Sequence, residues 1–125
     1  MVSKRLVVLV VTLIVAIGLV GCGGSKEQAA SPDVVAAGQT AFASACSACH
    51  GPDAKGVPNL GKDLTASTFT KGLSDADLIA FTKKGRPAND PQNTTKVDMP
   101  PKGGNPALTD DQLTAIVAYL RTLQK

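Results

Sequence analysis

The chain has 125 residues, with 13 lysines and arginines, 10 aspartates and glutamates, three cysteines and a single histidine. This length is enough for one domain of ordinary size. The formal net charge of +3 is too small for the strongly basic surface of a nucleic-acid-binding protein, so that class is excluded.

An uncharged apolar run occupies residues 6–21, directly after a short segment that contains Lys4 and Arg5. A basic segment followed by a short apolar run is typical of a secretory signal. The run is shorter than the roughly 20 residues that a membrane-spanning helix needs, which favours cleavage over a permanent span. Its end, residues 19–22 (LVGC), resembles the lipobox of bacterial lipoproteins, whose cysteine is diacylated.

We therefore expect residues 1–21 to be a lipoprotein signal peptide that is cleaved before Cys22, and Cys22 to carry the lipid. An ordinary signal peptide, or an uncleaved anchor that happens to end in cysteine, is the alternative. Residues 22–33 are small and polar, and we expect them to form a lipid-anchored flexible linker. The protein would then be extracytoplasmic and tethered to a bacterial cell membrane, because two acyl chains suffice for stable attachment.

The remaining residues, 34–125, show helical periodicity and none of the alternation typical of strands. A first helix is predicted from Val34, with Asp33 as its N-cap. Capping patterns that begin at Ser74 and Thr109 predict a second and a third helix. The sequence thus predicts an all-α domain.

Residues 51–63 and 86–106 are rich in glycine, proline and asparagine, and we expect both to be loops. The second is about twenty residues long, and loops of that length in a compact domain usually have a function. Its notable side chain is Met99. With three phenylalanines, one tyrosine and no tryptophan, the apolar core is thin, so we expect something else to fill the interior.

Cys46, Cys49 and His50 fall in the sequence Cys-Ser-Ala-Cys-His. A tetrahedral zinc site needs four ligands, and no second cysteine pair remains once Cys22 is assigned to the lipid. A thioredoxin-like redox pair expects a βαβ setting, which the helical pattern does not provide. The same spacing is that of covalent haem attachment, in which both thiols add to the vinyl groups and the histidine binds the iron.

The second axial ligand is restricted by composition. His50 is the only histidine, so two histidine ligands from one chain are impossible, and Met99 is the only methionine besides Met1. A single methionine often fills a core, but a polar loop with neighbouring prolines is a poor core position. We expect Met99 to be the sixth ligand; an open position, or a lysine or asparagine ligand, is the alternative.

With these motifs the chain resembles the class I (mitochondrial-type) c-type cytochromes, specifically small bacterial monohaem members in a lipoprotein form. The residues that carry the resemblance are Gly38, Phe42, Cys46-Ser47-Ala48-Cys49-His50, Gly51, Pro58, Leu60, Met99-Pro100 and Tyr119. The resemblance covers nearly all of residues 34–125. It implies a cytochrome c fold, with three to four helices around one covalently bound haem c and with the first and last helices crossing at Gly38, Phe42 and Tyr119.

The resemblance also implies a partner for the free ring nitrogen of His50, namely the carbonyl of Pro58. A purely turn-forming role for Pro58 is the alternative. Lys83, Lys84 and Arg86 are candidates to pair with the haem propionates, although lysines at a helix end are more often simply solvated.

The function expected from these features is one-electron transfer. With both axial positions of the iron occupied, no substrate can bind the metal, so we expect a carrier and not an enzyme. Its expected partners are membrane or extracytoplasmic redox proteins, and we expect the carrier itself to be monomeric. The alternatives are a five-coordinate haem sensor or peroxidase-like enzyme, and a fixed haem subunit of an oxidase or reductase complex.

Overall fold

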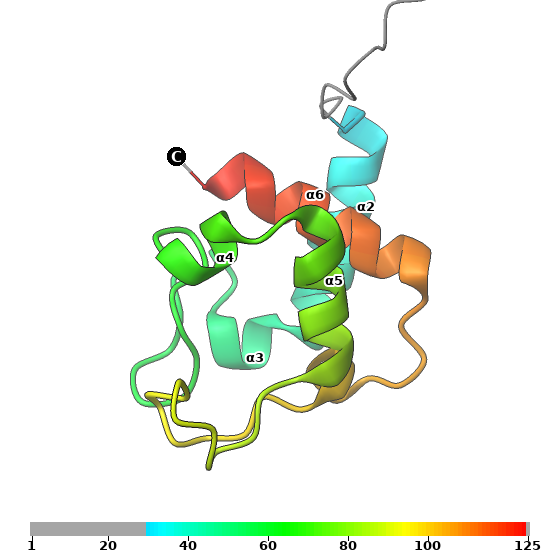
Figure 1. Cartoon of the computed structure of the whole chain (residues 1–125). Helices are drawn as coiled ribbons and strands as arrows, with labels where there is room; N and C mark the ends of the chain where they lie inside the picture. The colour runs from blue at the N-terminus through cyan, green and yellow to red at the C-terminus, as the bar shows by residue number, and fades with distance from the viewer. Residues whose placement is uncertain (1–29, 125) are drawn as a thin grey trace, which may run out of the picture.

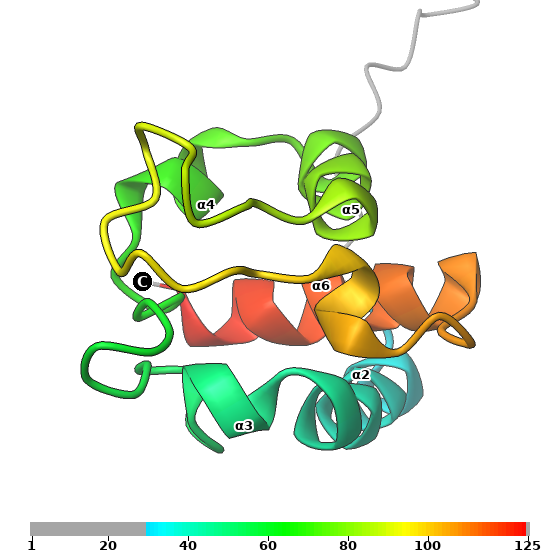
Figure 2. The same ribbon diagram turned by 90° about the horizontal axis from the view of Figure 1, so that it is seen from below.

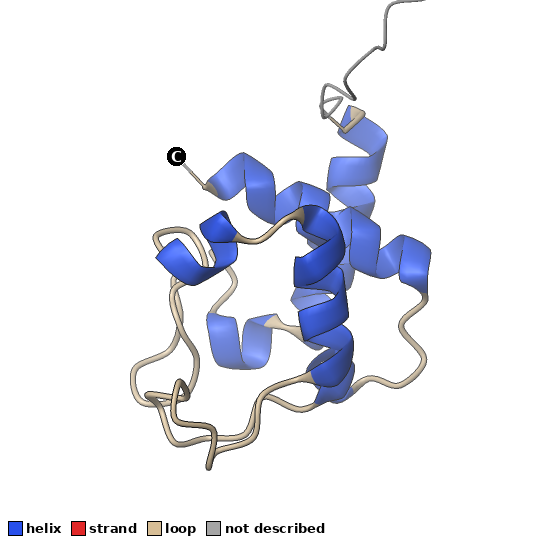
Figure 3. Ribbon diagram, viewed as in Figure 1, coloured by secondary structure: helices blue, strands red, loops and turns tan. Residues whose placement is uncertain are grey.

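The computed structural model describes residues 30–124, so the predicted signal peptide, Cys22 and most of the predicted linker lie outside the described residues. The described residues form α2 (Pro32–Ala45), α3 (Ser47–His50), α4 (Thr68–Gly72), α5 (Asp75–Lys84), the 3-10 turn η1 (Pro101–Gly104) and α6 (Asp110–Leu123). Figure 3 shows helices and loops only, which confirms the all-α prediction for this part of the chain. With the short α3 and α4, residues 30–124 contain five α-helices, more than the three to four expected.

The first helix begins earlier than the sequence predicted. The side chain of Ser31 accepts a hydrogen bond from the Val34 backbone at 3.4 Å, and Pro32 occupies the first helical position. Proline suits that position because its φ is already helical and its missing N–H would have no partner there. The prediction of Asp33 as the N-cap is therefore wrong, and Asp33 instead lies in the first turn, where its charge suits the helix dipole.

Helices α2 and α6 cross in close contact, as the resemblance implied (Figure 1). A Cβ atom added at Gly38 would overlap the backbone carbonyl of Ala115 and meet the Cβ of Tyr119 at 3.0 Å. One turn further along α2, the ring of Phe42 packs against Tyr119 with 5.7 Å between ring centroids. Because only glycine fits at the crossing point, this position fixes how α2 lies against α6.

The apolar core is small and lies around this crossing. Its buried members are Ala41, Phe42, Ala54, Leu108, Leu113, Ile116, Tyr119 and Leu120. In Figure 2, α2 and α3 lie on one side of the molecule and α4 and α5 on the other, with α6 running behind the space between them. The buried core thus lies at the α2–α6 crossing and not between the two sides of the molecule. This agrees with the thin core expected from composition.

The predicted caps of the two longer C-terminal helices are confirmed. Ser74 accepts a hydrogen bond from the Asp77 backbone at 3.1 Å at the start of α5. At the start of α6, Thr109 and Gln112 form a reciprocal capping box, with bonds of 3.2 and 3.0 Å. These local bonds satisfy backbone N–H groups that have no partner within the helix.

Arg121 joins α6 to the segment that connects α4 and α5. Its guanidinium donates to the Asp75 carboxylate at 2.8 Å and to the carbonyls of Thr70 and Leu73 at 2.9 and 2.7 Å. Arg121 is not among the residues that line the cavity described below, although its acceptor Thr70 is. These bonds hold the start of α5 and the end of α4 against α6.

None of the helices between residues 30 and 124 is both long enough and apolar enough to cross a bilayer.

We predict that Gly38→Ala destabilises the domain, because its methyl group would push α2 away from the Ala115 carbonyl. Overpacking of this kind costs about 1–3 kcal/mol, and about 1 kcal/mol lowers the thermal midpoint of a domain this size by roughly 4–8 °C. Thermal unfolding followed by circular dichroism measures the effect. The matched control is Gly72→Ala in α4, where an added Cβ meets nothing within 4 Å; equal midpoints for the two variants would contradict the prediction.

Candidate functional site

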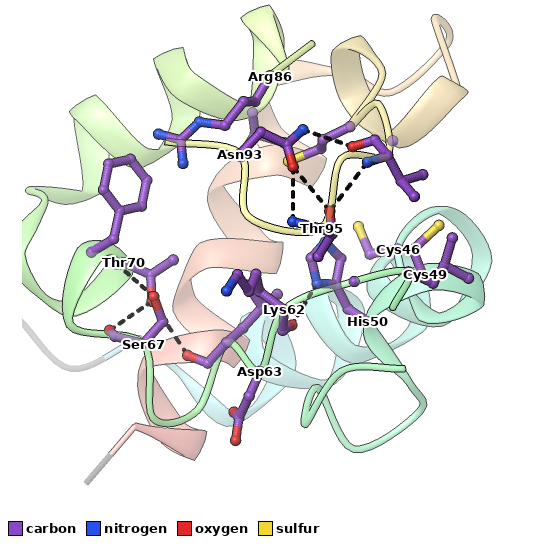
Figure 4. A pocket seen from close by; sticks show the side chains of 18 of the residues that line it. Cys46, Cys49, His50, Lys62, Asp63, Ser67, Thr70, Arg86, Asn93 and Thr95 are labelled. Carbon is purple, nitrogen blue, oxygen red and sulfur yellow. Dashed lines mark hydrogen bonds between the residues drawn. The ribbon is translucent and has the colours of Figure 1, made fainter. Parts of the chain in front are cut away.

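A cavity of about 590 Å³ lies between the two sides of the fold (Figure 4). This volume is within the range of roughly 300–1,000 Å³ typical of ligand pockets in proteins. Of the predicted site residues, Cys46, Cys49, His50 and Met99 line the cavity, and Pro58 does not. Segments far apart in the sequence thus bring four of the five predicted residues to one space.

The two cysteines and the histidine are held by the short helix α3. The Cys46 backbone N–H donates to the Phe42 carbonyl at 2.8 Å, and the Cys46 carbonyl then accepts from His50 at 3.0 Å. Cys46 therefore ends α2 and begins α3, so the buried end of α2 sets the position of α3. Cys46 and Cys49 are three positions apart and so face the same side of this turn.

The thiols have properties that argue against two of the alternatives. Cys46 and Cys49 form no disulfide. Burial, and to a lesser extent the neighbouring Cys49, raises the pKa of the Cys46 thiol to about 11, whereas a redox-active thiol needs a lowered pKa. Within residues 30–124, no cluster of three or more histidine, cysteine or acidic side chains could bind a metal ion. The described residues thus give no support to a zinc site, and the raised pKa of Cys46 does not favour a redox-active thiolate.

The imidazole of His50 is oriented by a backbone carbonyl. Its Nδ1 lies 2.8 Å from the Lys62 carbonyl oxygen (Figure 4). A carbonyl can only accept, so Nδ1 carries the proton and Nε2 keeps its lone pair for a metal. A donor bond of this kind fixes the ring and raises the basicity of the other nitrogen, as in many metal-binding histidines.

The prediction that the Pro58 carbonyl accepts this bond is wrong. Pro58 is exposed and occupies the second position of a turn in which the Leu60 N–H donates to the Val57 carbonyl at 3.0 Å. Asn59, at the third position, has a φ of 62°, and proline followed by a left-handed residue is the pattern of a type II turn. Pro58 therefore reverses the chain, and Lys62 reaches the histidine after the reversal.

Gly61 allows the returning chain to pass directly against α3. A Cβ at this position would overlap the backbone carbonyl of Cys49 and meet the His50 backbone nitrogen at 3.2 Å. The absent side chain thus brings the next residue, Lys62, within hydrogen-bond reach of the imidazole. No pattern in the sequence identifies Lys62, because every residue type has the same carbonyl.

Met99 lines the cavity from the long loop that follows α5. Its backbone pairs with Arg86 in an antiparallel bridge, with both N–H···O bonds at 2.8 Å. Arg86 follows Gly85, the residue that ends α5. The bridge therefore closes the intervening residues into a loop and sets Met99 beside the end of a helix. The long loop predicted from the sequence thus places Met99 at the cavity.

Of the three basic residues considered for the propionates, only Arg86 lines the cavity. Its guanidinium carbon lies over the rings of Phe69 and Phe81, 4.5 and 4.8 Å from their centroids. Lys83 instead forms an ion pair of 2.8 Å with Asp110. Contact with two aromatic rings stabilises the arginine's charge at the wall of the cavity.

Cysteines at this spacing on one helical turn, beside a histidine whose Nε2 is free, have an established use in small all-α domains, which is to attach haem. The fold and the site therefore define a c-type cytochrome. Comparison with known families leads to the same class: the cytochrome c family model matches residues 35–124, and the chain belongs to that family.

The similar proteins include two that are named cytochrome c-555. The chain is 37% identical to cytochrome c-555 of Chlorobaculum thiosulfatiphilum over 86 residues, which cover 68% of this chain and 91% of that protein. Cytochrome c-555 of Prosthecochloris aestuarii is 33% identical over 86 residues, covering 69% of this chain and 84% of the relative. No solved structure matches the chain.

The similarity extends to part of a larger protein, the cbb3-type cytochrome c oxidase subunit CcoP of Rhodobacter capsulatus. The two are 34% identical over 88 residues, which cover 70% of this chain and only 28% of that subunit.

The described residues fit the cofactor of this family. Membership of the cytochrome c family implies one covalently bound haem c, with Cys46 and Cys49 in the attachment spacing. The cavity is of ligand size, both thiols line it, and the lone histidine beside them keeps one ring nitrogen free. The haem also explains why so small an apolar core suffices for this domain.

We predict that Cys46→Ala and Cys49→Ala each leave a single thioether and that the double variant has no covalently attached haem. A vinyl group that has not reacted extends the conjugation of the porphyrin, so the reduced absorption band of each single variant moves to longer wavelength. Denaturing mass spectrometry and absorbance measure both effects. Ser47→Ala, between the two cysteines, is the control and should keep both bonds; covalent haem in the double variant would contradict the assignment.

Proposed function

We propose that the protein is a membrane-tethered one-electron carrier whose haem iron is bound by His50 and Met99. One observation carries this proposal: the only histidine, and the only methionine of the described residues, line the same cavity as both attachment cysteines. They come from different segments, α3 and the long loop, and each would supply one ligand to the haem iron. The haem supplies an iron that alternates between the ferric and ferrous states.

The chain's own groups would set the properties of that iron. The Lys62 carbonyl accepts from Nδ1 of His50, which holds the imidazole in one orientation and strengthens its donor character. A methionine thioether, in contrast, favours the reduced state and raises the reduction potential. With both positions taken, no site remains on the metal for a substrate, which supports a carrier over an enzyme.

Arg86 is the candidate partner for a haem propionate, because it lines the cavity and carries a permanent charge. Its Nε is buried without a hydrogen bond, and its nearest acid, Asp90, lies 3.6 Å away, which is an ion-pair distance and not a hydrogen bond. A carboxylate of the cofactor would satisfy this donor better than Asp90 does.

The tether we propose is the lipid on Cys22, followed by a linker that ends at Ser31, because Pro32 and Asp33 already belong to α2. A random coil of about nine residues spans on average roughly 15–18 Å, so the domain would stay close to its membrane. Confinement of this kind raises the effective concentration of membrane partners. We propose that the carrier acts outside the cytoplasm, as a monomer, and docks transiently on redox proteins through a small interface.

A second candidate function is favoured by the likeness to CcoP, whose name makes it a subunit of an oxidase. In this case the domain would be a fixed haem subunit and not a shuttle. Gentle solubilisation of membranes distinguishes the two functions: a fixed subunit co-purifies in stoichiometric amount with an oxidase or reductase, whereas a shuttle is recovered alone.

We predict that Met99→Leu, which keeps side-chain volume but removes the sulfur, abolishes the weak long-wavelength charge-transfer band of the ferric protein. We also expect the reduction potential to fall by more than about 59 mV, which is a tenfold change for a one-electron couple. Spectroscopy and redox titration measure both quantities. Asn89→Ala, an exposed residue of the same loop that does not line the cavity, is the control. If the parent protein lacks the band, the iron is not bound by sulfur, and the sensor or peroxidase-like alternative is favoured.

The tether is tested independently of the haem. We predict that the native protein is recovered with membranes and that its intact mass corresponds to a chain beginning at Cys22 with haem and acyl chains. Replacement of residues 1–22 by an ordinary cleavable secretory signal should give a soluble protein with an unchanged absorbance spectrum. A native protein that is soluble and carries no acyl mass would refute the lipid anchor.

A further inference from the structure

The segment that carries Met99 to the cavity is itself an organised unit, which we call the methionine loop (residues 87–98). The Arg86–Met99 bridge closes its base. Most of its residues are exposed, so little apolar burial holds it in shape. Asn93 is the exception, because this polar residue in the middle of the loop is only 6% exposed.

The Asn93 amide makes hydrogen bonds on both of its sides (Figure 4). Its Nδ2 donates to the carbonyls of Pro87 and Val97, at 3.1 and 2.7 Å. Its Oδ1 accepts from the backbone and hydroxyl of Thr95, at 3.2 and 2.9 Å, and from the Lys96 backbone at 3.0 Å. Both donors and the acceptor are thus used, and only a side-chain amide of this length offers both kinds of group.

The two donated bonds join the two legs of the loop. Pro87 directly follows Arg86, and Val97 lies two residues before Met99, so both carbonyls are next to the bridge at the base. A third connection between the legs runs from the Ala88 backbone N–H to the Asp98 carboxylate at 2.5 Å. The amide therefore connects the two legs close to Met99, and Asn93 itself also lines the cavity.

We propose that Asn93 is a positioning residue, whose amide holds the methionine loop closed and so keeps the Met99 thioether on the haem iron. The inference rests on the proposed ligation by His50 and Met99. The physical reason is that hydrogen bonds, and not burial, hold this loop, so its local opening is governed by a few bonds. Loss of the amide donors removes both of the bonds that Asn93 makes across the base of the loop and favours the open loop, in which the thioether leaves the iron.

The opening can be measured with imidazole, a small ligand that binds ferric iron once methionine has left. Asn93→Asp keeps the shape and the acceptor of the side chain but removes both donors and sets a negative charge beside the Pro87 and Val97 carbonyls. We expect imidazole to bind this variant at least about tenfold more tightly than the parent protein, an effect of about 1.4 kcal/mol. The titration is followed by the disappearance of the sulfur charge-transfer band as imidazole is added. The covalent haem content of the variant should equal that of the parent protein.

Two control variants isolate the role of the amide. Asn89→Asp places the same charge on an exposed residue of the same loop, and Arg121→Gln weakens the fold at the α4–α5 connection. We expect both to bind imidazole like the parent. If Arg121→Gln tightens binding as much as Asn93→Asp does, general destabilisation explains the effect and the proposal is wrong.

The parent protein offers a test that needs no variant, in case Asn93→Asp does not accumulate. Saturating imidazole should speed hydrogen exchange at the Thr95 and Lys96 amides, which donate to Asn93, and unchanged exchange there would overturn the proposal. Parent-like imidazole binding by Asn93→Asp would also overturn the proposal for Asn93. Loss of the sulfur band in Met99→Leu would then still support ligation by Met99. A parent protein without the band would refute both the ligation by Met99 and the role of Asn93.

Discussion

The close crossing of α2 and α6 at Gly38 is the constraint on which the rest of the structure depends. It sets the direction of α2, and the Cys46 backbone then connects the end of α2 to α3, which carries both cysteines and His50. Helix α6 is in turn joined to the other wall through Arg121 and through the Lys83–Asp110 pair. Both walls of the haem cavity are thus held in place by contacts with one helix, α6.

The two sides of the cavity are held in different ways. On the histidine side, the turn of α3 and the Lys62 carbonyl fix the imidazole ring. Gly61 lets its own segment pack directly against the backbone of α3. On the methionine side, an exposed loop depends on the amide of Asn93 and on one backbone bridge. The histidine side is therefore the more tightly held of the two, and under the proposed ligation a change of ligand would begin at Met99.

The sequence predicted those features whose cause is local. The caps at Ser74 and Thr109 depend on side chains a few residues apart, and the cysteine pair has a spacing with few uses. The two errors arose from neighbouring residues. Pro32 favours the first helical position, so Ser31 and not Asp33 is the N-cap of α2. The turn at Pro58 reverses the chain, so the Lys62 carbonyl and not that of Pro58 lies next to His50. Asn93 could not be found, because asparagine in a proline-rich loop is normally exposed and only the folded loop buries it.

The place where the chain enters the domain has a geometric consequence for electron transfer. In Figure 1 the Pro32 end of α2 lies at the opposite end of the molecule from the methionine loop. A domain held from that end would present its Met99 face to the aqueous compartment and not to the lipid surface. Redox proteins that dock from solution would then find that face uncovered, whereas a neighbour embedded in the same bilayer could reach it only after the domain tips over on its linker.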